Sequence, residues 1–337
     1  MKTNTINFFD NYFSLIAAGA RLKLVEPMFH LDLFALFDMH STVLERDIIE
    51  QLCLMPLRAQ KWLHLLSCEH FLIKTTLNNQ TAYQLPDEFI ALKGSDAWWE
   101  MKLFFNSWKV ASEENLSDVL RFGKVKTSVS WPPKKDVEVD WLEQWMANTA
   151  NKPVDCILEQ IDFTKVKQVL DVGGGDGTVA CALAKAHPHL HVSVYNLPKS
   201  AAKARKNCES QGLHERVHVL EGDFIAEDSF PKGFDLILFT RVLFDWDEKT
   251  DRKLLQMAYQ ALVNDGLVAI CEYYKDKSND RCVASEYRYI FHDDFAANVF
   301  KSKATYQQML AEIGFILMPN KETKLVNAYH ELLLAKK

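Results

Sequence analysis

The sequence lacks several features that would each indicate a class of protein. A membrane-spanning helix needs about 20 consecutive apolar residues, and the sequence has no apolar run of that length. Near its start Asp10 and Arg21 enclose only a short uncharged stretch, so we expect neither a membrane anchor nor a signal peptide. The formal net charge of −6 argues against binding to nucleic acid. The seven cysteines form no CxxC pair, so we expect mostly buried thiols, a reduced cytoplasmic compartment and no metal site.

The sequence does contain a glycine-rich segment, VLDVGGGDGT at residues 169–178, between two apolar runs. Val169 and Leu170 are typical of a short strand, and Val179, Leu183 and Ala186 recur at helical spacing after the glycines. A strand that leads into a helix through glycines directs free backbone N–H groups at whatever occupies the turn. The segment therefore predicts a cofactor loop, with a tight turn that holds no ligand as the alternative.

The spacing within this loop indicates which ligand it suits. A phosphate-binding P-loop needs a Gly-Lys-Ser/Thr ending, and the turn contains no lysine. The dinucleotide motif calls for a small third residue where this chain has Thr178, and Asp176 would repel a pyrophosphate. Asp171 and Asp176 suit a ligand with a cationic end, such as an ammonium or sulfonium group.

The order of motifs along the chain is more specific than any single motif. VLDVGGGDGT is followed by AKAHPHL, VYNLP, EGDF, FDLILFTRVLFDWDE and AEIGF. In this order the chain resembles the S-adenosylmethionine-dependent small-molecule O-methyltransferases of plants and bacteria, the group of the caffeate, acetylserotonin and polyketide O-methyltransferases. The resemblance covers nearly the whole chain. It implies an α/β fold, with a Rossmann-like class I methyltransferase sheet, mostly parallel and with helices on both faces, after an N-terminal all-helical, winged-helix dimerisation domain.

With 337 residues, 48% of them hydrophobic, the chain is long enough for two domains. We expect a winged-helix-like dimerisation domain over 1–95, connecting helices that line the acceptor pocket over 96–155, and a cofactor-binding catalytic domain over 156–337. A helix is predicted over 249–262, ending at Asn264-Asp265-Gly266. The predicted strands of the catalytic domain are 168–171, 191–195, 217–221, 235–240, 267–273, 315–318 and 328–335. Ligands of such a sheet lie beyond the carboxyl ends of its strands.

The first 95 residues predict helices around Gly19, then two further helices and a hairpin that turns at Asn78-Asn79. This order is typical of a winged helix, a fold that often binds DNA. Its second helix, residues 58–67, is largely apolar and offers few basic side chains to phosphates. We therefore expect the homodimer that the resemblance implies rather than DNA binding, with the aromatic-rich early helices against the partner chain.

The resemblance implies a set of cofactor-binding residues at the strand ends. Asn196 stands where the family has an aspartate that accepts hydrogen bonds from both ribose hydroxyls, and the loss of charge predicts cofactor binding weaker by about 1 kcal/mol. Asp223 would accept from the adenine amine and Phe224 would cover the ring. The other positions implied for S-adenosylmethionine are Asp171, Gly173, Gly175, Leu197 and Arg241.

The acceptor side departs from the family pattern. Where the family has the histidine that removes the acceptor's proton, this chain has Phe244, and where a glutamate orients that histidine it has Phe300. Glu272 and His292 are the candidates to replace the base, and either side chain could instead be structural. Asp245 with Glu248 predicts a helix cap.

The resemblance also implies an acceptor pocket lined by aromatic and apolar residues. Its candidates are Trp141, Trp145, Met146, Phe291 and Phe300. Packing between domains is at least as good an interpretation for Trp141, Trp145 or Met146.

A methyl transfer without the histidine remains chemically reasonable, because alignment of donor and acceptor supplies several kcal/mol by itself. A neutral nitrogen, an enol carbon or an ionised phenol needs no strong base. The sequence thus predicts a methyltransferase of a small, aromatic or heteroaromatic metabolite, with N- or C-methylation raised relative to O-methylation. The alternatives are an enzyme of this fold that retains the cofactor for a reaction other than methyl transfer, and a non-catalytic binding protein.

Overall fold

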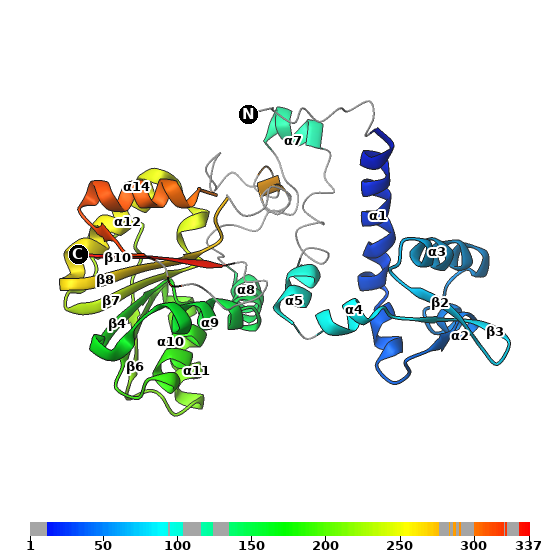
Figure 1. Cartoon of the computed structure of the whole chain (residues 1–337), viewed down its shortest axis with the longest axis horizontal. Helices are drawn as coiled ribbons and strands as arrows, with labels where there is room; N and C mark the ends of the chain where they lie inside the picture. The colour runs from blue at the N-terminus through cyan, green and yellow to red at the C-terminus, as the bar shows by residue number, and fades with distance from the viewer. Residues whose placement is uncertain are drawn as a thin grey trace. The chain divides into compact units, whose positions relative to one another are not determined.

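The computed structural model describes residues 12–93, 95–103, 116–123, 135–275, 283, 286, 287, 290, 300–319, 321 and 330–337. The chain divides into two compact units, Met1–Val110 and Ala111–Lys337, and each unit is described by itself (Figure 1). The division falls inside the predicted connecting segment 96–155. That segment therefore contributes helices to both units.

The N-terminal unit begins with the long helix α1 (Tyr12–His30) and the short helix η1 (Leu33–Phe37). Helix α1 runs unbroken through Gly19, where the sequence suggested a division between helices. Phe34 packs edge-on against Trp98, with ring centroids 4.7 Å apart, and this pair lies in the core of the unit. Trp98 belongs to α5 (Asp96–Leu103), which follows α4 (Asp87–Leu92).

The middle of this unit has the predicted order of two helices and a hairpin. Helices α2 (Glu45–Gln51) and α3 (Pro56–Cys68) precede the antiparallel strands β2 (Ile73–Leu77) and β3 (Gln80–Gln84), and β1 (Val43–Leu44) pairs with β3. Asn78 and Asn79 join the hairpin with φ angles of 51° and 59°, as a two-residue turn between twisted strands requires. Helix α3 buries Ala59, Leu63 and Leu66.

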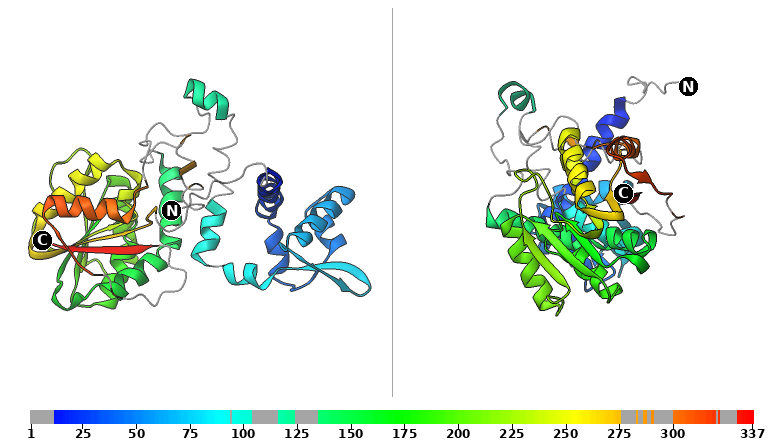
Figure 2. Two further views of the ribbon diagram at one scale, coloured as in Figure 1. Left: turned by 45° about the horizontal axis from the view of Figure 1, so that its top comes forward. Right: turned by 90° about the vertical axis from the view of Figure 1, so that its left-hand side faces the viewer.

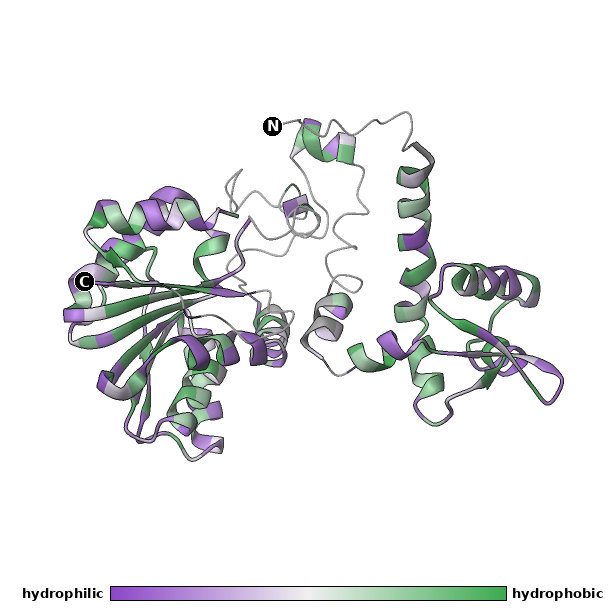
Figure 3. Ribbon diagram, in the orientation of Figure 1, coloured by the Kyte–Doolittle hydropathy of each residue, from purple (hydrophilic) through white to green (hydrophobic). Residues whose placement is uncertain are grey.

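The C-terminal unit is built on a seven-stranded sheet in the order β6-β5-β4-β7-β8-β10-β9. The first five of these strands are parallel, and β10 and β9 are antiparallel to their neighbours. Most of the strand residues are hydrophobic, as expected for strands covered on both faces (Figure 3). The strands are β4 (Gln168–Val172), β5 (His191–Asn196), β6 (Val217–Glu221), β7 (Phe234–Thr240), β8 (Leu262–Glu272), β9 (Ile316–Leu317) and β10 (Glu331–Lys336).

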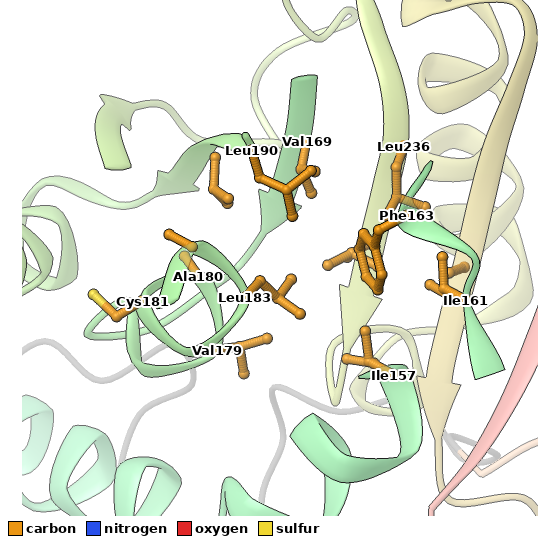
Figure 4. Packing of buried hydrophobic residues seen from close by; sticks show 14 of the residues in the cluster. Ile157, Ile161, Phe163, Val169, Val179, Ala180, Cys181, Leu183, Leu190 and Leu236 are labelled. Atoms are coloured by element: carbon orange, nitrogen blue, oxygen red, sulfur yellow. The ribbon is translucent and has the colours of Figure 1, made fainter. Parts of the chain in front are cut away.

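Helices cover both faces of the sheet (Figure 2). Alternation along β7 explains the two layers: Leu236 and Leu238 pack against one face, and Ile237 and Phe239 against the other. The first face holds α9 (Asn151–Gln160), α10 (Thr178–Ala186) and α11 (Pro198–Ser210), and Figure 4 shows part of this core, to which η3 (Phe163–Lys165) contributes. The second face holds α12 (Glu248–Ala261) and α14 (Lys303–Ile313). The remaining helices are α7 (Leu116–Phe122), α8 (Asp136–Asn148) and η4 (Leu243–Asp245).

The bounds predicted for α12 agree with the structure to one residue, but the signals predicted at its two ends are wrong. The helix ends at Ala261, and Leu262 already belongs to β8, so Asn264-Asp265-Gly266 lies within an irregular strand start, where Asp265 has a φ of 63°. The helix is capped by Asp247, whose side chain accepts from the Thr250 N–H at 2.8 Å, and not by Asp245. Asp247 has the extended backbone that an N-cap needs, whereas Asp245 is buried in η4.

The described helices include none with the length and apolar character to cross a membrane. Within the same described residues, no cluster of three or more histidine, cysteine, aspartate or glutamate side chains is placed to hold a metal ion.

Candidate active site

The glycine turn after β4 leaves no room for side chains. Gly173 has a φ of +68°, and a Cβ there would lie 2.9 Å from Cγ2 of Val242, while a Cβ at Gly174 would overlap the carboxylate of Asp171. The turn is held by two backbone hydrogen bonds, from Gly173 to Tyr195 at 2.8 Å and from Gly177 to Gly174 at 2.9 Å. The bare main chain therefore forms a surface that a ligand can approach closely.

The two aspartates of the predicted cationic site have different roles. Asp176 Oδ1 accepts from the backbone N–H and the hydroxyl of Thr178, at 3.0 and 2.6 Å, so this carboxylate stabilises the first turn of α10. Asp171 is fully buried beneath Gly174, and neither of its oxygens has a hydrogen-bond partner among the described residues. Burial raises the pKa of Asp171 to about 7, and the charge of Arg241 opposes this rise. Asp171 thus places unsatisfied acceptors under the loop.

A second buried carboxylate at the loop was not anticipated from the sequence. Glu143, on α8, is 6% exposed, and its Oε2 lies 2.7 Å from where a Cβ of Gly175 would be. That oxygen has no hydrogen-bond partner in the described part of the chain. Burial raises the pKa of Glu143 to about 7, and a hydrogen bond from Ser200 lowers it. The only sequence signal was an acid within the otherwise aromatic and apolar run WLEQWM.

These residues fit a ligand that is cationic at one end and rich in hydrogen-bond donors. Two buried carboxylates with unsatisfied oxygens lie against a turn that only glycine can form, and buried polar groups need partners. S-adenosylmethionine brings an ammonium, a sulfonium and two ribose hydroxyls. Asp171, Glu143 and the glycine turn would hold it, and it would supply an electrophilic methyl group.

Asn196, at the end of β5, is bonded to the loop itself. Its amide nitrogen donates to the carbonyl of Gly175 at 2.9 Å, and its amide oxygen accepts from the N–H of Leu197 at 2.9 Å. An aspartate at this position could not make the first of these bonds. Leu197 caps α11 without a side-chain hydrogen bond and is half-buried. The cofactor roles of both residues stay predictions.

The two residues predicted to bind adenine lie in the turn after β6. Asp223 is exposed, and its Oδ1 accepts from the N–H of Ile225 at 2.9 Å. Phe224 is half-buried and packs edge-on against Trp246, with centroids 5.7 Å apart. Trp246, which follows η4, thus contacts Phe224 and helps to fix the orientation of its ring. A ring that covers adenine would need such support.

Arg241, after β7, ties the sheet to α8. Its guanidinium donates to the Thr149 hydroxyl at 2.6 Å and to the carbonyl of Met146 at 2.7 Å, and lies 5.7 Å from the ring of Trp145. Because these acceptors are at the carboxyl end of α8, the cation also interacts favourably with the helix dipole. Arg241 has a φ of 59°, a conformation that non-glycine residues seldom adopt outside constrained sites. It thereby fixes two of the predicted pocket residues, Trp145 and Met146.

Phe244, which the resemblance predicts to stand in place of the family's base, lies in an aromatic wall. Phe244 stacks on Phe300 with centroids 5.3 Å apart and planes 15° from parallel. Tyr273, which the sequence analysis missed, meets Phe300 edge-on at 5.6 Å. Neither phenylalanine can accept a proton, so this part of the site offers an apolar, planar surface.

Polar groups hold the Phe244 turn from two sides. Oε1 of the fully buried Glu272 accepts from the N–H groups of Val242 and Leu243, at 2.8 and 2.9 Å. Lys301 donates to the carbonyls of Leu243 and Trp246, at 3.3 and 2.6 Å. Lys301 in turn pairs with the buried Asp251 at 2.9 Å. These contacts favour a positioning role for Glu272 through the backbone, and its part as a base stays a prediction.

We expect Glu272→Gln to flatten the pH dependence of stability. Burial raises the pKa of Glu272 to about 8, although the two N–H groups lower it, and Asp245 and Asp251 raise it further. Since the folded pKa exceeds the unfolded value of about 4.3, this group's contribution is complete below the unfolded pKa and is lost as pH rises through about 8. Glutamine stays neutral, so urea unfolding from pH 5 to 8 should show the variant losing less free energy of unfolding, by a few kcal/mol. Parallel curves for the two proteins would contradict the assignment.

Three predicted site residues lie wholly or partly outside the described part of the chain. Phe291 and His292 lie outside the described residues, and Trp141 lies on α8 with a side chain outside the described set. Trp145 and Met146 are half-buried on the same helix, and Phe300 is buried. The pocket roles of all six candidates, Phe244 included, stay predictions.

The sheet order, the glycine turn and its buried carboxylates together define the class of S-adenosylmethionine-dependent methyltransferases. The model of the O-methyltransferase domain family matches residues 133–316, more than half of the chain. The chain belongs to this family.

Individual relatives differ in the reactions that their names state. An L-tyrosine C(3)-methyltransferase from Streptomyces lavendulae is 31% identical over 161 residues, 47% of this chain and 44% of the relative. An aclacinomycin 10-hydroxylase from Streptomyces purpurascens is 34% identical over 111 residues, 33% of this chain and 29% of the relative. The matched segment thus spans less than half the length of either. The crystal structure of human N-acetylserotonin methyltransferase with S-adenosylmethionine shares the fold at a TM-score of 0.74 and 16% identity, covering 100% of this chain and 99% of that one.

Proposed function

We propose that this protein transfers a methyl group from S-adenosylmethionine to a small aromatic or heteroaromatic acceptor whose nucleophile needs no strong base. The observation that carries the proposal is the stack of Phe244 on Phe300, with Tyr273 at its edge, where the family has an imidazole and a carboxylate. A planar acceptor gains offset-stacked or edge contacts on such a wall. The wall orients the acceptor but leaves its proton untouched.

The chemistry favours nitrogen, carbon or an already ionised oxygen as the methylated atom. In the transfer a lone pair on nitrogen or oxygen, or the π electrons of an enol, form the new bond to the methyl carbon, the carbon–sulfur bond breaks, and S-adenosylhomocysteine leaves. A positioned base typically contributes 10²–10⁴-fold in rate when the nucleophile starts protonated. A neutral amine or an enol carbon releases its proton to solvent only after the transfer. These acceptors lose least from the exchange of histidine for Phe244.

A second form of this proposal retains a base. In it, Glu272 or His292 removes the proton of an ordinary phenol, and the phenol oxygen is methylated. Glu272 Oε2 has no hydrogen-bond partner among the described residues, while Oε1 is used by two backbone N–H groups. A carboxylate with a pKa of about 8 is matched to proton transfer near neutral pH. Full burial counts against this role, because the proton must reach an oxygen beneath the turn.

Two candidates outside methyl transfer have support of their own. The aclacinomycin 10-hydroxylase bears a name that states a different reaction. The Phe244–Phe300 pair would suit an apolar cage for such chemistry beside a retained cofactor. A non-catalytic binding role is supported by the missing base and by the loss of charge at Asn196.

The deciding experiment incubates the purified chain with methyl-labelled S-adenosylmethionine and a panel of phenols, heteroaromatic amines and enolisable aromatic ketones. We expect S-adenosylhomocysteine and an equal amount of labelled product with an amine, an enol or an acidic phenol. Label transfer confined to weakly acidic phenols would contradict the preference. Cofactor binding without S-adenosylhomocysteine from any acceptor would favour one of the other two roles.

The remaining parts of the proposal concern partners and location. We propose a homodimer through the N-terminal unit, supported by the exposed Leu15, Ile16 and Leu22 on α1. The described cysteines are free thiols, which supports a reduced, cytoplasmic compartment. The acidic net charge supports a protein that binds no nucleic acid.

A further inference from the structure

Glu143 is a buried carboxylate of the C-terminal unit, and the proposed function does not say which part of the cofactor it would bind. It lies on α8, more than 25 residues before the glycine turn, yet its Oε2 is the atom nearest to a Cβ built on Gly175. The side chain is 6% exposed, and that oxygen has no hydrogen-bond partner in the described part of the chain. A buried carboxylate oxygen without a donor is costly, so the position implies a ligand that brings one.

The neighbours of Glu143 place it on one side of the turn. Its carboxylate interacts with the Ser200 side chain and the Asp176 backbone, and both segments adjoin the end of β5. Arg241 follows β7, which lies on the other side of β4, and has the smallest effect on the pKa of Glu143. Glu143 therefore lies on the β5 side of the loop, where the family places the acid that binds ribose.

Asn196, which occupies that family position, is largely committed to the protein. Its amide nitrogen donates to Gly175 and its oxygen accepts from Leu197. Asn196 and Glu143 thus contact the same glycine. Asn196 donates a hydrogen bond to the carbonyl of Gly175, and the carboxylate of Glu143 packs against the Cα of Gly175. A neutral amide holds the loop, and the carboxylate beside it has a free oxygen.

We propose that Glu143 accepts hydrogen bonds from the ribose hydroxyls of S-adenosylmethionine and takes the part that an aspartate after the second strand has in the family. The inference rests on the proposed function only in that the chain binds this cofactor. A ribose contact from Glu143 explains why the chain can have asparagine at position 196, because the carboxylate is then supplied by α8. A charge-assisted hydrogen bond is about twice as strong as a neutral one, so this exchange retains affinity that Asn196 alone would lose.

The test compares Glu143→Gln with the full-length wild type by calorimetric titration of two ligands. S-adenosylhomocysteine has both the ribose and the amino-acid end, and 5′-methylthioadenosine has the ribose without the amino acid. We expect Glu143→Gln to raise the dissociation constants of both ligands by about ten-fold. Asp140→Asn removes the same charge from the exposed face of α8, where Asp140 pairs with Lys203, and should leave both constants within two-fold.

A pH series provides a readout that a merely structural role would not change. The carboxylate form accepts hydrogen bonds, and burial raises the pKa of Glu143 to about 7, with Asp176 raising and Arg241 lowering it. Affinity of the wild type for 5′-methylthioadenosine should fall as pH drops from 8 to 6, and that of Glu143→Gln should change less. Thermal melting of the variant, which keeps the side-chain shape, should match the wild type and so verify its fold.

Three outcomes would overturn the proposal. A loss of affinity for S-adenosylhomocysteine but not for 5′-methylthioadenosine would assign Glu143 to the amino-acid end instead. Unchanged constants for both ligands, with a folded variant, would make Glu143 structural. An equal loss of affinity in Asp140→Asn would show that the effect comes from the net charge of the protein and not from a contact with Glu143. Failure of the wild type to bind either ligand would be a separate result, since it contradicts the cofactor assignment itself.

Discussion

Phe244→Ala should lower turnover of the acceptor by about a hundred-fold while the dissociation constant for S-adenosylhomocysteine stays within two-fold. The substitution removes the ring that stacks on Phe300 at 5.3 Å, so a planar acceptor loses one side of its binding surface. Misplacement of a reacting atom by about 1 Å costs on the order of 10²-fold in rate. The cofactor contacts proposed above come from the glycine turn, β5 and α8, which the substitution does not alter.

Steady-state kinetics with an acceptor from the product assay, together with calorimetry, would check this expectation. Phe244→Leu is the graded variant, because it keeps an apolar side chain and should lose less activity than alanine. Ile316→Ala, a truncation at a side chain that is exposed on β9, should leave turnover unchanged. If Phe244→Ala behaves like Ile316→Ala, the acceptor binds elsewhere.

Lys301→Met should lower the free energy of unfolding by about 3–5 kcal/mol, the usual cost of removing one partner of a buried ion pair. The side chains of Lys301 and Asp251 are 4% and 0% exposed, and their charged atoms are 2.9 Å apart. Burial already raises the pKa of Asp251 to about 7, and Lys301 opposes that rise. Methionine leaves the carboxylate buried without its cation and removes the hydrogen bond that Lys301 donates to the carbonyl of Trp246.

Urea unfolding at pH 8 would measure this loss, because in the wild type the carboxylate of Asp251 is then mostly ionised and paired with Lys301. Lys199→Met removes a lysine from an exposed pair, with Asp136, and should leave the free energy of unfolding nearly unchanged, because solvent screens such a pair. The double variant Lys301→Met, Asp251→Leu replaces the pair by apolar groups and should recover part of the lost stability. Equal stabilities of the Lys301 and Lys199 variants would show that the buried pair does not support the Phe244 turn.

The fold could be predicted from the sequence because the pattern of hydrophobic residues is local. The strands around Leu170, Val194 and Leu238 are short runs buried on both faces, and their ends in the structure agree with the prediction to within a few residues. The errors occur where neighbouring residues compete. Asp245 and Asp247 are both possible caps, and backbone geometry rather than residue type selects Asp247.

The candidate site was predictable only in part, because hydrogen bonding and burial decide what each polar side chain does. Asp171 and Asp176 look equivalent in the glycine segment, yet one carboxylate is buried without a described partner and the other stabilises α10. Asn196 is predicted to be a weakened ribose ligand, and nothing in the sequence indicates that its amide also bonds Gly175. Glu143 lies on a helix remote in sequence from the loop, so nothing in the local pattern connected the two.

Titration calorimetry of S-adenosylmethionine into the purified full-length chain tests the central claim most directly. If the turn at Gly173–Gly177 and its flanking carboxylates form a methyl-donor site, binding should saturate at one cofactor per chain below about 1 mM, a binding free energy more favourable than about −4 kcal/mol. No heat and no shift in melting temperature at that concentration would contradict the cofactor site, and with it the proposed function.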